Sequence, residues 1–495
     1  MSLALVLVLI YTLALAFIFL FSITQLQLTY NYWFKSKRLI DSSQKPIDDI
    51  DLPLVTIQLP VYNEKYVIER LIDAIIKLKY PIEKLQIQVL DDSTDETTDL
   101  IQQKINQYQE NGFQIELVRR PNREGFKAGA LKYGLGLAKG KYIAIFDADF
   151  LPKANFLLDL IPYLESDPSL GLVQTRWGHL NEHYSIITRL QAFALDAHFV
   201  IEQVGRNVGN HFINFNGTAG VWRKETILDA GNWESDTLTE DLDLSYRAQI
   251  KGWKFRYFKH LVSPAELPVT MNELKAQQRR WTKGAAETAR KHLLNVWRSD
   301  QKISTKLHAT MHLLNSAIFV AFMLAAISSV PILFVKSRLD NHLFLFQVSS
   351  LFLVSIFSLT LFYASSFFAL KKGTLKNILL FCITFPMLLS LSMGLSLHNA
   401  LAVLEGYAGK KTPFIRTPKY NIGLDKGNKK WIENSYRTQK ISPLTWLEGV
   451  LALYFGFGLF WGVFHHDFSL LLLHCLITFG FASIFLLSIK HAKLR

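Results

Sequence analysis

The chain is 495 residues long, half of its residues are hydrophobic, and its formal net charge is +13. A composition this apolar, with a positive mean hydropathy, excludes an ordinary soluble enzyme. With only two cysteines, a disulfide framework or a cysteine-based metal site is excluded as well. Basic residues gather beside apolar stretches, as at Lys371-Lys372 and Lys410-Lys411. This favours a bilayer with anionic lipids as a partner and argues against nucleic acid.

The first predicted element is a membrane-spanning helix. Leu3 to Ile23 contains no charged residue, and a helix of this length crosses the roughly 30 Å hydrocarbon core of a bilayer. It lacks the basic start and the cleavage site of a signal peptide. Lys35, Lys37 and Arg38 follow it, so the positive-inside rule predicts that the next region is cytoplasmic. Further apolar runs predict a multi-pass protein of the cell inner or plasma membrane: Met311–Val335, Leu343–Leu370, Ile378–Leu401, Trp446–Phe464 and Leu470–Ile489.

Between these spans, residues 31–305 are predicted to form one water-exposed domain. Short β-branched runs predict strands at Val55–Leu59, Leu85–Leu90, Ile115–Val118, Tyr142–Phe146 and Leu172–Thr175. Helical stretches separate them at Tyr66–Lys77, Thr97–Gln109, Phe126–Ala138 and Ala154–Glu165. This alternation predicts an α/β, Rossmann-like domain with a mostly parallel sheet, whose ligands bind beyond the carboxyl ends of the strands.

Acidic side chains follow three of these strands. Asn63-Glu64, Asp91-Asp92 and the pair Asp147 and Asp149 fall at their ends. The sequence has no phosphate-binding glycine loop of the ATPase or dehydrogenase type, so a bound nucleotide needs another way to neutralise its phosphates. Mg²⁺ or Mn²⁺ held by Asp147 and Asp149 is the natural one. Two alternatives remain open: a solvated turn after the strand, and an N-terminal capping cluster at Asp91 to Glu96.

Three later motifs carry further candidates. Lys127 opens a helix after Arg123-Glu124-Gly125 and can reach a phosphate, although plain capping also explains the stretch. Thr239 is predicted to cap a helix that contains Glu240 and Asp241 and is closed by Gly252. A capping box at Thr270 and Glu273 is predicted to start a helix that presents Gln277, Arg280 and Trp281 on one face. An interfacial helix is the alternative for this last stretch.

These motifs, in this order and between membrane segments, resemble the processive family-2 glycosyltransferases, the cellulose synthase-like enzymes. The resemblance implies a GT-A fold, a nucleotide-sugar donor, and Asp241 as the catalytic base. Since a sugar hydroxyl is a poor nucleophile near neutral pH, such a base must take its proton, and single displacement inverts the anomeric centre. The donor-binding positions that it implies are Asn63, Glu64, Asp91, Asp92, Lys127, Asp147, Arg280, Thr417 and Lys419.

The resemblance extends to the acceptor and to a gating-like loop. The acceptor-binding positions that it implies are Gln174, Thr175, Gly217, Thr218, Glu240, Gln277 and Trp281. Phe414 to Lys419 is similar to a loop that closes over the donor in that family. Arg176 and Arg416 stand where many members have proline and valine, and these departures are closer to the mannan and glucomannan synthase-like branch.

The expected function is membrane-embedded polymerisation of hexose from UDP-glucose or GDP-mannose into a growing β-linked polysaccharide, a β-glucan or (gluco)mannan, with translocation of the product. A single-transfer enzyme acting on a lipid carrier is the alternative, and a transporter with a degenerate nucleotide-binding domain is a third reading. Partner proteins in the envelope are not indicated. Polar residues near the spans, such as His312, Asn315, His398 and Asn399, either line a sugar path or bond helix to helix.

The predicted domain order is an N-terminal span (1–30), the cytoplasmic catalytic domain (31–305), membrane helices (306–404), a cytoplasmic gating-like loop (405–442) and a C-terminal membrane hairpin (443–495). One difficulty remains. Three apolar runs separate the catalytic domain from the loop, yet both are expected on the same side of the membrane. Ile378–Leu401, which contains Pro386, is therefore expected to be re-entrant or interfacial.

Overall fold

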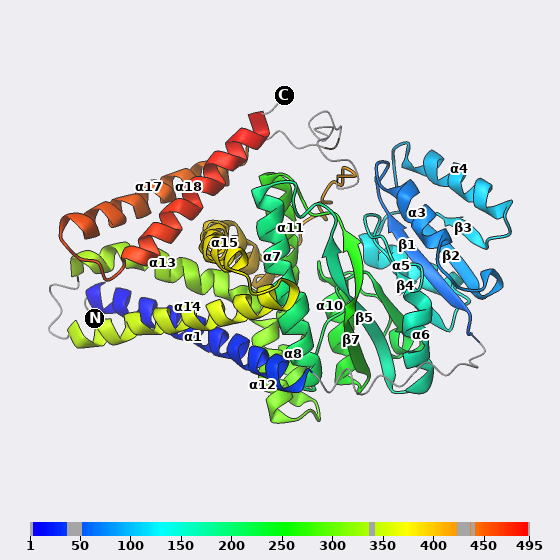
Figure 1. The fold of residues 1–495 in the computed structure, drawn as a ribbon, viewed down its shortest axis with the longest axis horizontal. Helices are drawn as coiled ribbons and strands as arrows, with labels where there is room; N and C mark the ends of the chain where they lie inside the picture. The colour runs from blue at the N-terminus through cyan, green and yellow to red at the C-terminus, as the bar shows by residue number, and fades with distance from the viewer. Residues whose placement is uncertain (1–2, 37–51, 336–341, 423–435, 437–440, 494–495) are drawn as a thin grey trace.

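A computed structural model describes residues 3–36, 52–335, 342–422, 436 and 441–493 of the chain. Long apolar helices form one end of the molecule and a helix-covered sheet forms the other (Figure 1). Helix α11 (Met271–Arg298) stands between the two parts and borders both. Within the predicted gating-like loop, 405–442, the structure describes residues 405–422, 436, 441 and 442, so Lys426, Lys429 and Lys430 lie outside the described residues, as do Lys37 and Arg38.

The sheet has seven strands in the order β3-β2-β1-β4-β6-β5-β7. Their bounds are β1 (Val55–Val61), β2 (Leu85–Asp91), β3 (Ile115–Val118), β4 (Tyr142–Ile145), β5 (Leu170–His179), β6 (Gly220–Arg223) and β7 (Lys254–Ala265). The first four strands are mutually parallel, whereas β6 runs antiparallel between β4 and β5. The mostly parallel sheet is confirmed. Strands β6 and β7 were not among the predicted elements.

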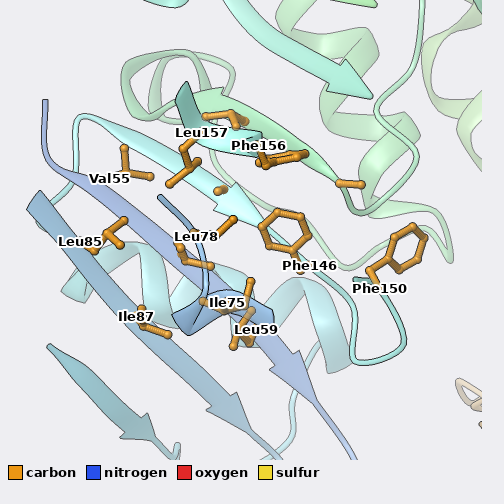
Figure 2. Close-up of a cluster of buried hydrophobic side chains, with 14 of the residues drawn as sticks. Val55, Leu59, Ile75, Leu78, Leu85, Ile87, Phe146, Phe150, Phe156 and Leu157 are labelled. Carbon is orange, nitrogen blue, oxygen red and sulfur yellow. The ribbon is translucent and has the colours of Figure 1, made fainter. Parts of the chain in front are cut away.

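Helices cover both faces of the sheet, because its strands are apolar on both sides. All seven positions of β2 are buried. One core lies under α3 and α6, where Ile75 and Leu157 pack over Val55, Leu59 and Phe146 (Figure 2). The other packs α5 against β4 and the Trp222 and Trp233 rings. The helices of this domain are α3 (Ile68–Ile76), α4 (Thr97–Gln109), α5 (Phe126–Leu137), α6 (Phe156–Ser166), α9 (Lys224–Asp229) and α10 (Glu240–Ile250).

Two predicted helix starts have different outcomes. The capping box of α11 is confirmed, since Thr270 accepts from the Glu273 backbone N–H and Glu273 accepts from that of Thr270. At α10 the predicted side-chain cap is wrong: Thr239 occupies the N-cap position but its hydroxyl lies 3.1 Å from that of Thr288. Packing of α10 against α11 therefore fixes this turn in place of local capping.

Six helices among the described residues are long and apolar enough to cross a membrane, namely α1 (Leu3–Lys35), α13 (Ile318–Val335), α14 (His342–Leu370), α15 (Leu375–Gly394), α17 (Pro443–Phe464) and α18 (Leu471–Lys493). The predicted run Ile378–Leu401 is not one helix, because α15 ends at Gly394 and a separate helix, α16 (Ser396–Tyr407), follows. Figure 1 shows α15 nearly end-on, whereas the other five run along the page. Shorter helices at the junction with the sheet are α7 (Ile186–Ala197), α8 (Gln203–Val208) and α12 (Ile303–Leu313).

Candidate active site

A cavity of about 190 Å³ opens where β1, β2 and β4 end. Parallel strands bring their carboxyl ends to one edge, so motifs far apart in sequence converge there. Helices α10 and α11 and the segment 414–419 close the remaining walls. Among the lining residues are the predicted Glu64, Asp92, Asp147, Asp149, Asp241 and Arg280.

Asp147 and Asp149 both face this cavity directly after β4. The backbone N–H of Asp147 donates to the Thr218 hydroxyl at 2.9 Å, and Asp149 Oδ2 accepts from the Glu266 N–H at 3.1 Å. Each carboxylate forms an ion pair with a lysine: Lys127 Nζ is 2.5 Å from Asp147 Oδ1, and Lys419 Nζ is 2.7 Å from Asp149 Oδ2. Hard oxygen ligands that already attract cations fit Mg²⁺ or Mn²⁺, so the pair suits the predicted metal.

A second acidic cluster, Glu234, Asp236 and Asp243, lies elsewhere in the domain. Its centre is filled by the Lys291 ammonium, which lies 2.5, 2.8 and 2.8 Å from the three carboxylates. The cluster is therefore an ion-pair network that ties α10 and α11 together.

Asp241 lies in the first turn of α10 and points into the cavity. Burial, and then repulsion by the neighbouring Glu240 carboxylate, raise the pKa of Asp241 to about 7. Next to Asp241 is Gly217, whose φ of +78° favours glycine. A side chain there would lie 3.0 Å from Asp241 Oδ2 and 3.4 Å from Lys127 Nζ. A carboxyl with this pKa in the wall of a cavity has the properties of a general base near neutral pH.

The predicted donor residues at the ends of β1 and β2 divide into two groups. Asp92 lines the cavity and is held by Arg120, with Nε at 2.8 Å from Oδ1 and Nη2 at 2.5 Å from Oδ2. Asp91 is buried and does not line the cavity, because it accepts from the Ser93 N–H and the Thr98 hydroxyl. In this structure the Asp91 carboxylate shapes the turn and does not face the cavity.

Asn63, like Asp91, does not line the cavity and bonds the turns at the strand ends. Its left-handed backbone, with φ of +54°, and its side-chain oxygen, which accepts from the Thr94 N–H at 2.9 Å, join the two strand ends. Beside it, the Arg123 guanidinium lies 3.3 Å from the centre of the Tyr62 ring, and both groups line the cavity. The stacked Tyr62 ring and Arg123 guanidinium form a flat, positively charged surface next to Asp92, on which a nucleobase can stack. Tyr62 and Arg123 were not assigned this role by sequence.

The segment 414–419 closes over the donor side of the cavity. Arg416 makes a forked pair with Glu64, at 2.9 and 2.8 Å, and burial raises the pKa of Glu64 to about 7. Phe414 stacks on Phe126, and the Arg280 guanidinium lies 5.0 Å from the Phe414 ring. The residue that departs from the usual gating motif is therefore the one that fixes the segment to β1.

Some of the predicted acceptor residues line the cavity and others do not. Gln277 and Trp281 line the cavity beside Arg280, as their helical spacing predicts, and Gly217 and Glu240 line it too. Gln174 and Thr175 do not. Both are fully buried, and they hold the loop before β6: Gln174 Nε2 donates to Thr218 O at 3.2 Å, and the Thr175 hydroxyl donates to Ala219 O at 2.7 Å. These two residues, and Thr218, whose hydroxyl accepts from the Asp147 N–H, lie outside the cavity lining and support its wall.

Trp281 also lines a second cavity, of about 300 Å³, among α1, α13 and α14. Its wall carries Gln25, His198, Glu202 and Asn315. Of the polar residues predicted near the spans, Asn315 thus lines a space, whereas His312 bonds the Tyr246 hydroxyl at 2.9 Å and His398 bonds the Lys275 carbonyl at 3.2 Å. One tryptophan therefore borders both the first cavity and a second one among the apolar helices that has a few polar groups in its wall.

A GT-A-like domain with paired aspartates, a candidate base and a row of apolar helices defines a membrane glycosyltransferase. The family model for glycosyl transferase family group 2 matches residues 142–394, half of the chain, and that for glycosyl transferase family 2 matches residues 56–225. The chain belongs to family 2 of the glycosyltransferases.

Curated relatives narrow the class to hexosyltransferases related to glucomannan mannosyltransferases. The chain is 42% identical over 279 residues to probable glucomannan 4-beta-mannosyltransferase 4 of Oryza sativa subsp. japonica, covering 56% of this chain and 50% of that one. It is 43% identical over 258 residues to glucomannan 4-beta-mannosyltransferase 9 of Arabidopsis thaliana, covering 50% and 48%. The chain spans about half the length of the curated relatives it matches.

Among solved structures, mannosyltransferase PcManGT from Pyrobaculum calidifontis, in complex with GDP-Man and Mn²⁺, is similar with a TM-score of 0.53 at 19% identity. The similarity covers 80% of this chain and all of that one. At this identity the likeness concerns the fold alone, which it confirms as GT-A.

Proposed function

We propose that this protein is an inverting, processive glycosyltransferase that builds a β-linked mannan or glucomannan from GDP-mannose and passes it into the membrane helices. The observation that carries the proposal is the position of Trp281, which borders both cavities. An acceptor sugar stacked on this ring has its reducing end directed towards the second cavity. The names of the curated relatives support the sugar.

The residues of the chain supply the steps of the transfer. A divalent ion on Asp147 and Asp149 would neutralise the donor diphosphate when bound. Arg280, which is half-buried in the cavity wall and makes no ion pair among the described side chains, is placed to bind diphosphate oxygens in a forked geometry. Asp241 takes the proton of the acceptor hydroxyl as that oxygen attacks the anomeric carbon. One displacement inverts the α-linked donor to a β-linkage.

The proposed topology puts the catalytic domain in the cytoplasm. The pair between Arg416 and Glu64 requires segment 410–422 to lie on the same side of the membrane as the sheet. Helices α13 and α14 supply two crossings, and α15, which runs across the others (Figure 1), supplies none. Single cysteines placed at Lys372 and Leu395, the two ends of α15, should both react with an impermeant maleimide from the cytoplasmic side. Reaction of one from each side would overturn this topology.

The function is tested by product size. Purified protein in nanodiscs would be incubated with Mn²⁺ and radiolabelled GDP-mannose, with UDP-glucose and UDP-N-acetylglucosamine in parallel. The expected product is an ethanol-insoluble polymer from GDP-mannose that β-mannanase degrades. A lipid-soluble monosaccharide as the sole product would favour single transfer to a lipid carrier, and a polymer from UDP-glucose alone would reject the proposed donor.

A further inference from the structure

The segment from Lys410 to Ile422 contains no helix or strand, yet its second half is buried. Thr417, Tyr420 and Ile422 are 4%, 6% and 6% exposed. An irregular segment needs partners for its backbone groups when it is buried. Here the partners come from one residue of the catalytic domain, Glu266, which follows β7 and is only 3% exposed.

The Glu266 carboxylate accepts two backbone hydrogen bonds from the segment. Its Oε1 accepts from the Tyr420 N–H at 2.7 Å and its Oε2 from the Ile422 N–H at 3.2 Å. The left-handed backbone of Asn421, with φ of +60°, turns these two N–H groups towards one carboxylate. Arg70 Nη2, 3.3 Å from Oε2, balances the buried charge.

The same residue connects the segment to the paired aspartates. The Glu266 carbonyl accepts from Lys419 Nζ at 2.6 Å, and the Glu266 N–H donates to Asp149 Oδ2 at 3.1 Å. Lys419 therefore lies between Glu266 and Asp149, with its ammonium 2.7 Å from an oxygen of one of the two carboxylates that would hold the metal ion. Two cations cannot share this oxygen at bonding distance, because their mutual repulsion is strong in a buried site.

We propose that Glu266 is a positioning residue that anchors segment 414–422 over the cavity with and without donor, while Lys419 exchanges one partner for another. Without donor, Lys419 takes the place of the metal at Asp149. When the metal and donor enter together, Lys419 moves from Asp149 to the diphosphate. The exchange leaves the net charge of the cavity unchanged, since a divalent ion and a diphosphate ester carry equal and opposite charge. This exchange rests on the proposed function, whereas the anchor does not.

The anchor is tested on the ligand-free protein in nanodiscs by hydrogen exchange of a peptide that spans 414–422. In Glu266→Ala, the amides of Tyr420 and Ile422 are expected to exchange at least about tenfold faster than in the wild type. Glu273→Gln is the matched control, because Glu273 is also buried and contacts the segment through the Tyr420 hydroxyl. It should leave the Ile422 amide protected. Equal protection in Glu266→Ala and the wild type would overturn the anchor.

Glu266→Gln keeps the side-chain volume, and it is a second variant in case Glu266→Ala fails to fold. Hydrogen exchange of the β1 amides shows whether each variant is folded. Because the amide retains only one acceptor atom, intermediate protection is expected. Addition of Mn²⁺ and GDP-mannose to the wild type should leave both amides protected. Loss of their protection would refute an anchor that persists with donor bound.

The proposed change of partner by Lys419 is tested by measuring Mn²⁺ binding in the absence of donor. Electron paramagnetic resonance reports the fraction of Mn²⁺ that is bound. Lys419→Met removes the competing cation, so Mn²⁺ alone is expected to bind at least about tenfold more tightly than to the wild type. With donor present, the same variant should show a raised KM for the nucleotide sugar. Unchanged Mn²⁺ affinity would overturn the exchange while leaving the glycosyltransferase assignment intact.

Discussion

Replacement of Asp241 by asparagine tests the assignment of the base most directly. The amide has the shape of the carboxyl group, and its oxygen can still accept from the Leu242 N–H, which lies 2.8 Å from Asp241 Oδ1. What disappears is the ability to take a proton. A positioned base contributes about 10²- to 10⁴-fold to a rate, so kcat should fall by that factor. Donor binding should persist, because the change removes a negative charge near the diphosphate.

The pH dependence of the wild type gives an independent check. The base acts when ionised, and the pKa of Asp241 is raised to about 7 by burial and by Glu240. The value of kcat/KM should therefore be constant above that pH and fall about tenfold per unit below it. The sign is that of a group whose protonated form is inactive. A rate that rises on acidification would contradict the assignment.

The assay is incorporation of radiolabelled GDP-mannose into polymer at saturating Mn²⁺, with donor affinity measured separately on the same preparations. Asp159→Asn is a suitable control, since burial also raises the pKa of Asp159 but this residue lies on α6, outside the cavity lining. It should keep both the rate and the acidic limb. If Asp241→Asn retained more than a tenth of kcat, or the same limb, another group would be the base.

Three further predictions use the same preparations. Gly217→Ala should lower kcat at least about tenfold and cost about 1–2 kcal/mol of stability, because the added carbon meets Asp241 at 3.0 Å on a left-handed backbone. The two effects are measured by kcat and by the melting temperature. An unchanged kcat would contradict the geometry. Asp149→Asn should raise the Mn²⁺ concentration for half-maximal rate about tenfold or more, whereas Asp236→Asn, in the cluster filled by Lys291, should not change it. Lys275 and Glu448 form a buried pair at 2.6 Å between α11 and α17; either Lys275→Met or Glu448→Gln alone should destabilise by about 3–5 kcal/mol, and the double variant by less than the sum. Additive losses in thermal denaturation would show that the pair is not coupled.

The sequence predicts the site best where the signal is local. The strands before Glu64, Asp92 and Asp147 are short apolar runs, and an acidic residue after each of them marks the edge at which parallel strands end. On α11 the spacing of Gln277, Arg280 and Trp281 is sufficient, because helix geometry alone puts residues three and four apart on one face. The cavity wall confirms both inferences.

Prediction is weaker where a residue's partner is distant in sequence. Gln174 carries a motif of the family, but whether its amide points to an acceptor or to backbone depends on the loop before β6, 44 residues later at Thr218. Glu266 has no motif, and its partners Tyr420 and Ile422 follow more than 150 residues later. The antiparallel strand β6 is only four residues long. Its place between β4 and β5 is fixed by tertiary packing, which no local pattern encodes.

The environment, more than the residue type, separates the roles of the three aspartates in the cavity. Asp147 and Asp149 each have a lysine ammonium within 2.7 Å, so each lies where positive charge is stabilised. Asp241 has no ion pair among the described side chains, and its nearest acidic neighbour is Glu240. Asp147 and Asp149 therefore lie where a bound cation is stabilised, whereas burial and the Glu240 carboxylate raise the pKa of Asp241 to about 7. A metal ion that displaced Lys419 from Asp149 would leave Asp241 unpaired still. The ligand and base functions proposed for these residues can therefore coexist within one cavity, because Lys127 and Lys419 make ion pairs with Asp147 and Asp149 and not with Asp241.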